Sequence, residues 1–451
     1  MKLVLISPKG PLYRHRGGIF KKNLRYAPLT LTTLAALVPP ELGMEIRLVD
    51  EGIEDVDPDL AADLVGMTVI TGSAPRAYEL AAHFRGRGIP VVLGGPHVTL
   101  IPEDAEPHAD SIVVGYAEDT WPQLLRDFAA GQLAPRYTQA PQLDLAHRPF
   151  PRRDMIARGS YLTTHVFEAT RACVHSCDFC VVPFAWGTKP YQKPVEEVVA
   201  DIRQHWARKI LFIDLNLIAD KEYAARLFTA LIPLKVRWFG LVTTLLGRDP
   251  ALLALAAKSG CSGLLMGFES IVPESLRQSR KGFNHPGEYR ELVEDLHRHR
   301  ITLMACFTFG MDHDTPDVFL KTARFAVEAH IDLPRFAIVT PFPNTALYHR
   351  LESEGRILTR NWEFYDAQHV VFAPRQLSPA ELYAGHEQAW KYTYSARSMA
   401  RRFLGSRIQV PVWWIANLGY RFYAHHLHDF YNCDWIVGQR AALPWARAGA
   451  A

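Results

Sequence analysis

The chain has 451 residues, more than one hydrophobic core usually serves, so two or three domains are expected. Hydrophobic residues make up 48% of the chain and charged residues 22%, an ordinary globular composition that excludes a largely disordered protein. The formal charge of +3 comes from 50 basic and 47 acidic residues without a long run of either sign, so nucleic acid is not indicated as a partner.

Residues 1–135 alternate short apolar runs with amphipathic stretches, the pattern of a parallel sheet covered by helices. The buried-strand runs end at Pro8, Thr71, Gly94 and Gly115, and each leads into a turn. We therefore predict an α/β, Rossmann-like (flavodoxin-like) domain whose ligand binds beyond the carboxyl ends of the strands. The first ten residues lack the pattern of a secretory signal, and we expect a cytoplasmic protein.

Residues 136–160 are rich in proline and are expected to form a linker. Six strand–helix repeats follow over residues 161–350, which predicts a partial (β/α)6 barrel of the TIM type. Residues 351–451 are expected to form a mainly helical cap. Within it, the aromatic stretch 410–423 is too short for a transmembrane segment, which needs roughly 18 apolar residues, but it is compatible with peripheral membrane contact.

Three of the six cysteines, Cys173, Cys177 and Cys180, lie within eight residues on a loop that follows a predicted strand. Soft thiolates suit an iron–sulfur cluster, and three of them would hold three irons of a four-iron, four-sulfur cluster and leave the fourth iron open. A zinc site is the main alternative, although it usually uses paired C-x-x-C motifs and a fourth ligand. Three incidental buried thiols are the remaining explanation.

The C-x-x-x-C-x-x-C spacing, with Phe179 before the last cysteine, resembles the radical S-adenosylmethionine (radical SAM) superfamily. The segments FIDLN, SGCSGLLMGFES, FTFGMDHDT and TPFPNTALYHRLESEGRI extend the resemblance to the branch with an N-terminal cobalamin-binding domain, which contains methylases and the anaerobic Mg-protoporphyrin cyclase. The resemblance implies that S-adenosylmethionine chelates the open iron and is cleaved by one electron to a 5′-deoxyadenosyl radical.

The same resemblance assigns four residues to the S-adenosylmethionine cleft: Asp214, Asn216, Gly267 and Glu269. Two of them also have ordinary structural explanations, because Asp214 could cap a helix and Glu269 could pair with Arg277 or Lys281.

In the first domain, the resemblance implies that cobalamin approaches the backbone at Gly72, Ser73, Gly94 and Gly95. The D-x-H-x-x-G signature of many cobalamin proteins is absent, and His15 is expected to be a loop histidine. GYAED replaces the G-E-G-E of the family. Two alternatives follow: cobalamin bound without a lower histidine ligand from the protein, or a domain that has lost cobalamin.

These features favour a cobalamin-dependent C-methyltransferase that acts on an unactivated carbon through a 5′-deoxyadenosyl radical. The first alternative is a rearrangement, cyclisation or ring contraction with the same cofactors, and the lesser one is a non-catalytic iron–sulfur or cobalamin-binding regulator. The expected partners are a small-molecule substrate and an external electron donor such as flavodoxin or ferredoxin. The aromatic tail near Trp414 suggests an apolar substrate, although a packing helix explains the tail equally well.

Overall fold

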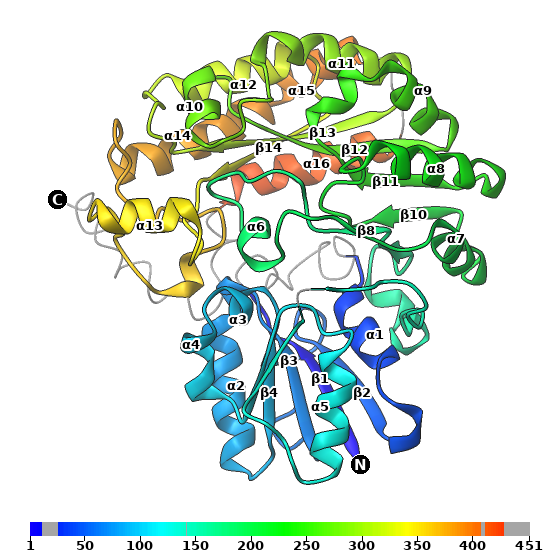
Figure 1. Ribbon diagram of the computed structural model, residues 1–451. Coiled ribbons are helices and arrows are strands. Elements are labelled where there is room, and N and C mark those ends of the chain that lie inside the picture. The colour runs from blue at the N-terminus through cyan, green and yellow to red at the C-terminus, as the bar shows by residue number, and fades with distance from the viewer. Residues whose placement is uncertain (11–25, 141, 407–410, 428–451) are drawn as a thin grey trace.

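Two six-stranded parallel sheets form the scaffold of the computed structural model, which describes residues 1–10, 26–140, 142–406 and 411–427 (Figure 1). A two-stranded antiparallel ribbon, β8 (Thr170–Arg171) with β9 (Tyr191–Gln192), completes the sheets of these residues. Helices cover both faces of the first sheet and the outer face of the second (Figure 1). The predicted α/β class is confirmed.

The first sheet has the strand order β2-β1-β3-β4-β5-β6. Its strands are β1 (Lys2–Ser7), β2 (Glu45–Asp50), β3 (Leu64–Thr68), β4 (Val91–Gly94), β5 (Ser111–Val114) and β6 (Arg136–Thr138). Three longer helices pack on it, namely α1 (Leu29–Ala36), α2 (Ala74–Gly86) and α5 (Thr120–Ala129). Because β2 and β3 flank β1 on opposite sides, the topology is flavodoxin-like, as predicted.

Strand β6 occupies the start of the segment expected to be a linker. It pairs with β5, with Ile112 opposite Arg136, and it buries Tyr137, whose hydroxyl donates to Asp127 Oδ2 over 2.7 Å. The strand has only three residues, a tyrosine between an arginine and a threonine. It therefore contains no apolar run from which a strand could be predicted.

The second sheet has the order β14-β13-β12-β11-β10-β7 with every pair parallel. Its strands are β7 (Val166–Phe167), β10 (Lys209–Phe212), β11 (Arg237–Leu241), β12 (Cys261–Glu269), β13 (Thr302–Phe309) and β14 (Leu333–Ile338). The outer helices include α7 (Val195–Gln204), α8 (Lys221–Leu231), α9 (Pro250–Lys258), α11 (Tyr289–Arg298) and α12 (Val318–Glu328). This arrangement confirms the predicted (β/α)6 partial barrel.

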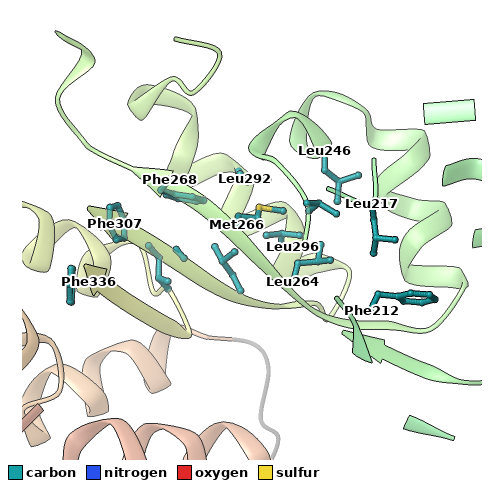
Figure 2. Close-up of a cluster of buried hydrophobic side chains, with 14 of the residues drawn as sticks. Phe212, Leu217, Leu246, Leu264, Met266, Phe268, Leu292, Leu296, Phe307 and Phe336 are labelled. Atoms are coloured by element: carbon teal, nitrogen blue, oxygen red, sulfur yellow. The ribbon is translucent and has the colours of Figure 1, made fainter. Parts of the chain in front are cut away.

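The core of the barrel lies between this sheet and its outer helices. Leu264, Met266 and Phe268 of β12 alternate with less buried residues and pack beside Phe307 and Leu296, as Figure 2 shows. Alternating burial gives each strand a face toward these helices and a face toward the inside of the barrel. The strand ends therefore present side chains at one rim of the barrel.

The C-terminal part is mainly helical, as expected, with α13 (Ala346–Ser353), α14 (Pro379–Thr393), α15 (Ala396–Gly405) and α16 (Pro411–His425). A capping box between Ser378 and Glu381 begins α14. Trp390 of that helix donates from Nε1 to the carbonyl oxygen of Phe336 over 3.1 Å, which fastens α14 to β14. Within the ranges described, no helix combines the length and apolar character that a membrane crossing requires.

The carboxyl edge of the first sheet faces the barrel (Figure 1). Helix α3 (Pro96–Leu100), which follows β4, contacts α6 (Val182–Ala185), which follows the cysteine loop. Asn344 Nδ2 donates to the carbonyl oxygen of Leu100 over 3.0 Å, and the Tyr161 hydroxyl donates to Asp50 Oδ2 over 3.1 Å. The carboxyl ends of the strands, where ligands bind in parallel folds, thus face each other in the two domains.

Candidate active site

The cysteine loop begins directly after β8 and ends at α6. Ala172 has a φ of 65°, and this left-handed residue turns the chain into the loop immediately before Cys173. The backbone N–H of Cys180 donates to the carbonyl oxygen of Cys177 over 3.2 Å, which tightens the second half of the loop. Cys177 is buried, Cys173 and Cys180 are half-buried, and all three are free thiols.

Two backbone hydrogen bonds hold this loop against the barrel. The N–H of Asp178 donates to the carbonyl oxygen of Ser279 over 3.2 Å, and the N–H of Leu347 donates to the carbonyl oxygen of Asp178 over 3.0 Å. The loop is therefore tied both to the segment after α10 (Pro273–Gln278) and to α13.

The donor set suits a cluster better than a single metal ion. Among the described residues, no three His, Cys, Asp or Glu side chains converge tightly enough to hold one ion. A zinc site needs such convergence, whereas in a four-iron cluster each of the three thiolates binds a different iron. Burial raises the pKa of the Cys177 thiol to about 12 and also raises that of Cys180. These thiols need a bound cation to exist as thiolates near neutral pH.

Lys281 supplies positive charge beside this loop, and sequence analysis gave it no more than a structural pairing role. Its ammonium donates to Glu269 Oε1, and the Thr308 hydroxyl donates to Glu269 Oε2 over 2.9 Å. Burial disfavours the charged ammonium, but Glu269 and the neighbouring Cys177 outweigh burial and raise the pKa of Lys281. Of the two alternatives for Glu269, the structure selects Lys281, because Arg277 pairs with Glu274.

Gly267 leaves room for that ion pair. A Cβ atom at this position would lie 2.2 Å from Glu269 Oε1 and 2.7 Å from Lys281 Nζ. The register shifts between Gly267 and Glu269, and Glu269 has a φ of 62°, so an irregular strand end turns the carboxylate back over the glycine. The predicted pair Gly267 and Glu269 forms one structural unit with Lys281.

Asn216 and Asp214 follow β10 and have different partners. The Asn216 side-chain amide donates to Cys173 Sγ over 3.9 Å, which places it at the cysteine loop. Asp214 Oδ1 instead accepts from the backbone N–H groups of Ala169 and Thr170, at the start of β8. Burial, followed by the charge of Glu168, raises the pKa of Asp214 to about 7. Asp214 therefore orients the chain that leads into the loop, and it does not cap a helix.

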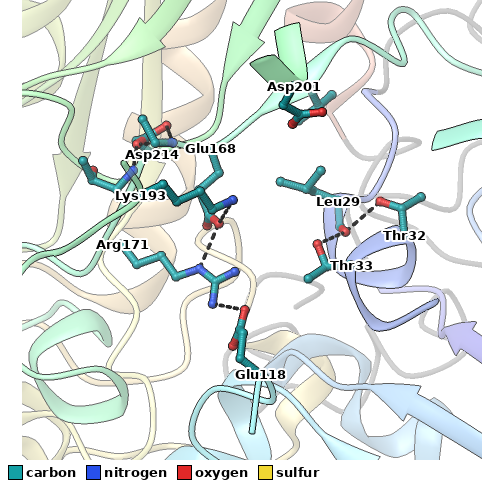
Figure 3. Close-up of polar contacts among 12 residues, drawn as sticks. Leu29, Thr32, Thr33, Glu118, Glu168, Arg171, Lys193, Asp201 and Asp214 are labelled. Carbon is teal, nitrogen blue, oxygen red and sulfur yellow. Dashed lines mark hydrogen bonds and ion pairs between the residues drawn. The ribbon is translucent and has the colours of Figure 1, made fainter. Parts of the chain in front are cut away.

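A charge network that sequence analysis missed joins the loop to the first domain (Figure 3). Arg171, two residues before Cys173, donates from Nε to Glu168 Oε2 over 2.8 Å. Its Nη1 atom lies 2.5 Å from Oε1 of Glu118, which belongs to the GYAED segment after β5. Lys193 also pairs with Glu168 at 3.3 Å. Burial opposes these charges, but Arg171 and Lys193 lower the pKa of Glu168, so this carboxylate stays ionised.

Aromatic contacts reinforce this junction. The Tyr116 ring stacks on Trp186 with centroids 4.2 Å apart, and the Arg171 guanidinium lies 4.9 Å from the centre of the Tyr116 ring. GYAED thus contacts both ends of the cysteine loop. Nothing in the sequence indicates that residue 118 contacts residue 171. The charged residues Glu168 and Arg171, which directly precede the cysteine motif, are the local feature that could have pointed to this network.

Of the four residues predicted to approach cobalamin, Ser73, Gly94 and Gly95 make close contacts within the protein, and Gly72 is buried. The Ser73 hydroxyl donates to the carbonyl oxygen of Ile70 over 3.1 Å, and the short helix η4 (Thr71–Ser73), which includes Gly72, contacts η11 (Trp362–Phe364). A Cβ at Gly94 would touch Val113, and one at Gly95, whose φ is 103°, would lie 2.8 Å from the backbone nitrogen of Val69. Chain packing alone explains both glycines.

His15 and His97 are two of the four histidines of this domain. His15 lies outside the described residues. His97, which follows the Gly94–Gly95 turn, is fully buried, and its Nε2 atom lies 3.1 Å from both the Tyr78 hydroxyl and Asp104 Oδ2. The His97 ring is therefore held by contacts within the protein.

Exposed apolar side chains lie at both strand edges. Ile70 follows β3 and is 45% exposed, Leu215 follows β10 and is 44% exposed, and Val174 in the cysteine loop is 43% exposed. Val174 and Leu215 adjoin two residues of the candidate site, Cys173 and Asn216, and are open to solvent there.

Comparisons with known proteins identify each part of the chain. Residues 25–125 match the B12 binding domain, residues 167–326 the radical SAM superfamily, and residues 345–414 a domain of unknown function (DUF4070). The bacteriochlorophyllide d C-8(2)-methyltransferase of Chlorobaculum tepidum is 31% identical over 374 residues, which cover 78% of this chain and 82% of that enzyme. The C-12(1)-methyltransferase of the same organism is 28% identical over 408 residues, 88% of each chain.

Among solved structures, the radical S-adenosylmethionine methyltransferase TsrM from Kitasatospora setae, with cobalamin and a four-iron, four-sulfur cluster bound, has the same fold. The TM-score is 0.68 at 16% identity, over 95% of this chain and 99% of TsrM. The predicted cofactors, a four-iron cluster, S-adenosylmethionine and cobalamin, are thereby confirmed at the level of the family. The chain belongs to the family of radical SAM enzymes in which a B12-binding domain precedes the radical SAM domain.

Proposed function

We propose that this enzyme transfers a methyl group to an unactivated carbon of an apolar small molecule. The observation that carries the proposal is the Glu118–Arg171 ion pair, which fixes the carboxyl edge of the B12-binding domain to the loop that bears the three cysteines. Two catalytic cofactors held at adjoining edges suit a reaction that needs both at one carbon atom. The Chlorobaculum tepidum relatives are named as methyltransferases, which supports the same conclusion.

In this proposal, Cys173, Cys177 and Cys180 hold the cluster, and Asn216 donates to the first of these sulfurs. The cluster and S-adenosylmethionine would supply the radical, and cobalamin the methyl group. Asp214, Asn216, Gly267 and Glu269 at the strand ends are the residues proposed to line the S-adenosylmethionine site, where the Glu269 carboxylate would attract the positively charged groups of that molecule. Lys281, beside the loop, would offset part of the negative charge of the cluster and its thiolates.

Cobalamin is proposed to lie at the carboxyl edge of the first sheet, near Gly72, Ser73, Gly94 and Gly95, without a histidine from the protein below the cobalt. Because Gly94 and Gly95 pack against neighbouring strands and the Ser73 hydroxyl bonds within its own turn, these three residues would contribute to binding only through the shape of the backbone. The exposed Ile70 side chain at the same edge offers apolar surface to the corrin or the substrate.

Reductive cleavage of S-adenosylmethionine takes one electron, and we propose that a flavodoxin or ferredoxin delivers it. We also propose a cytoplasmic location, in which thiols stay reduced. The five cysteines in the described part of the chain are all free, which supports this assignment.

The decisive experiment uses anaerobically reconstituted enzyme, cobalamin, a chemical reductant, and S-adenosylmethionine with a deuterated methyl group. Bacteriochlorophyllide d, the compound named for the two relatives, is the first candidate substrate. A product that carries the intact deuterated methyl group supports the proposal. A product with the same carbon count as the substrate would support the rearrangement or cyclisation alternative instead, and a complete absence of S-adenosylmethionine cleavage would contradict both.

A further inference from the structure

Glu269, which is proposed to line the S-adenosylmethionine site, lies at the centre of a strained turn. The backbone N–H of Ser270 donates to the carbonyl oxygen of Phe268 over 2.8 Å, and Glu269 between them has a φ of 62°. A hydrogen bond that spans one residue with a positive φ marks the rarer form of the γ-turn, which residues other than glycine seldom adopt. Such a turn persists only where neighbouring groups hold it.

The pairing of β12 with β13 is irregular at the same point. Gly267 lies opposite Cys306, and Glu269 lies opposite Phe307, the next residue of β13, so Phe268 is the extra residue of a bulge. A bulge interrupts the hydrogen bonds between the strands. The buried carbonyl groups around it therefore need donors from another part of the chain.

The side chain of Asn284 supplies these donors. Asn284 is 2% exposed, and its amide nitrogen donates to the carbonyl oxygens of Gly267 and Phe268 over 2.9 and 3.0 Å. The hydroxyl of Thr244, which follows β11, donates to Asn284 Oδ1 over 2.5 Å. Both N–H donors and the oxygen of the amide are thus used, and a reversed amide would direct its oxygen at two carbonyl groups. The orientation of Asn284 is therefore fixed.

The turn that contains Asn284 also contains Lys281. The backbone N–H of Asn284 donates to the carbonyl oxygen of Lys281 over 3.0 Å, and the N–H of Lys281 donates to the carbonyl oxygen of Leu276 in α10 over 2.8 Å. This turn meets the end of β12 twice: the Lys281 ammonium binds the Glu269 carboxylate, and the Asn284 amide binds the backbone just before Glu269. One short turn thus holds both the ion pair and the strained backbone that presents it.

We infer that Asn284 is a positioning residue for S-adenosylmethionine, because it holds the turn at Glu269 in the shape that places the Glu269 carboxylate against Lys281 beside the cysteine loop. Both amide donors of Asn284 are used by the backbone, so Asn284 acts through Glu269 and not by contact with the cofactor. Side chains that bind a ligand precisely need such fixed support. The role of Asn284 rests on the proposed place of Glu269 in the site and is independent of the methyl acceptor.

The test compares three anaerobically reconstituted variants with the unchanged enzyme: Asn284→Ala, Glu269→Gln and the double variant. Titration calorimetry measures the Kd of S-adenosylmethionine. We expect Asn284→Ala to keep its iron and sulfide and to bind S-adenosylmethionine about fivefold more weakly. Because Asn284 acts through Glu269, the double variant should bind no more weakly than Glu269→Gln alone.

Electron paramagnetic resonance of the reduced cluster gives a second measurement. Without S-adenosylmethionine, the spectrum of Asn284→Ala should equal that of the unchanged enzyme, because the cysteines are untouched. With S-adenosylmethionine added at a subsaturating concentration, the spectral change should be smaller in the variant. If Asn284→Ala does not fold, Thr244→Val decides the question, since it removes only the donor to Asn284 Oδ1 and should weaken binding about twofold.

Ser259→Ala is the matched control. The buried Ser259 hydroxyl accepts from Trp238 Nε1 over 2.9 Å just before β12 begins, so this variant loses a buried hydrogen bond at the opposite end of the same strand. Its affinity for S-adenosylmethionine should be unchanged.

Two results would overturn the role of Asn284 alone: additive losses of affinity in the double variant, or equal affinities in Asn284→Ala and Ser259→Ala while Glu269→Gln binds weakly. Unchanged affinity in Glu269→Gln would overturn the proposed place of Glu269 as well, which separates the two failures.

Discussion

The residues predicted to bind cofactors at the rim of the barrel and those predicted at the facing edge of the first sheet make different kinds of contact. At the barrel rim, Asn216 and Glu269 have polar atoms directed at the cysteine loop or at Lys281 beside it. At the edge of the first sheet, Gly94 and Gly95 pack against neighbouring strands, and the Ser73 hydroxyl bonds within its own turn. The predicted polar side chains of the barrel thus contact the cysteine loop or Lys281, whereas the predicted glycines lie where backbone segments pack closely.

The link between these two regions comes from residues outside both predicted sets. Arg171 is enclosed by Glu168 of its own domain and by Glu118 and Tyr116 of the first domain. A buried ion pair of this kind adds little net stability, but it fixes how two elements meet. Three variants therefore alter, one at a time, a cysteine of the loop, the ion pair between the two domains, and the glycine beside the Glu269–Lys281 pair.

The largest effect is expected for Cys177→Ala, which removes one of the three proposed iron ligands. Iron and sulfide bound after anaerobic reconstitution should fall severalfold, and reductive cleavage of S-adenosylmethionine should fall below detection. Cys261→Ala is the matched control, because this buried cysteine lies in β12 and donates only to the backbone carbonyl of Gly263. Normal iron content in the Cys177 variant would contradict the assignment of the cluster.

A smaller effect is expected for Glu118→Gln, which removes one charge from the link between the domains. Loss of a buried, charged hydrogen bond costs about 2 kcal/mol, equivalent to roughly 30-fold faster local opening. Hydrogen exchange should therefore accelerate in residues 115–119 and 170–173 while the cluster is retained. Asp119→Asn is the control, because Asp119 is 49% exposed in its pair with Arg148. Unchanged exchange at both segments would show that the pair does not fix the junction.

The next largest effect is expected for Gly267→Ala, which tests whether this glycine makes room for the Glu269–Lys281 pair at the rim of the barrel. The added Cβ would overlap the Glu269–Lys281 pair and displace it, so we expect roughly tenfold weaker binding of S-adenosylmethionine with the iron content retained. Titration of the reconstituted enzyme by calorimetry measures this affinity. Gly86→Ala in α2 is the control, since no atom lies within 4 Å of a Cβ built there. Equal affinity in the two variants would remove Gly267 from the site.

Most of the fold and part of the site were accessible from the sequence, for identifiable reasons. Long apolar runs such as residues 261–269 specify buried strands, and three closely spaced cysteines have few structural explanations. Strand β6 was missed because its pairing depends on a neighbouring strand and not on its own apolar content. The Glu118–Arg171 pair was missed because residues 53 positions apart meet only once both sheets are assembled.

The smallest expected effect concerns Asp214, whose carboxyl group orients the chain before the cysteine loop. Burial raises the pKa of Asp214 to about 7, against about 3.9 in an unfolded chain, so between these values the folded protein holds a proton that the unfolded chain has released. The contribution of Asp214 to the free energy of unfolding therefore decreases as pH rises from about 4 to about 7. Asp214→Asn cannot titrate, and its amide oxygen can still accept from the N–H groups of Ala169 and Thr170. The difference in thermal stability between this variant and the unchanged protein should consequently shift in favour of the variant as pH rises through that range. A difference independent of pH would mean that Asp214 has an ordinary pKa.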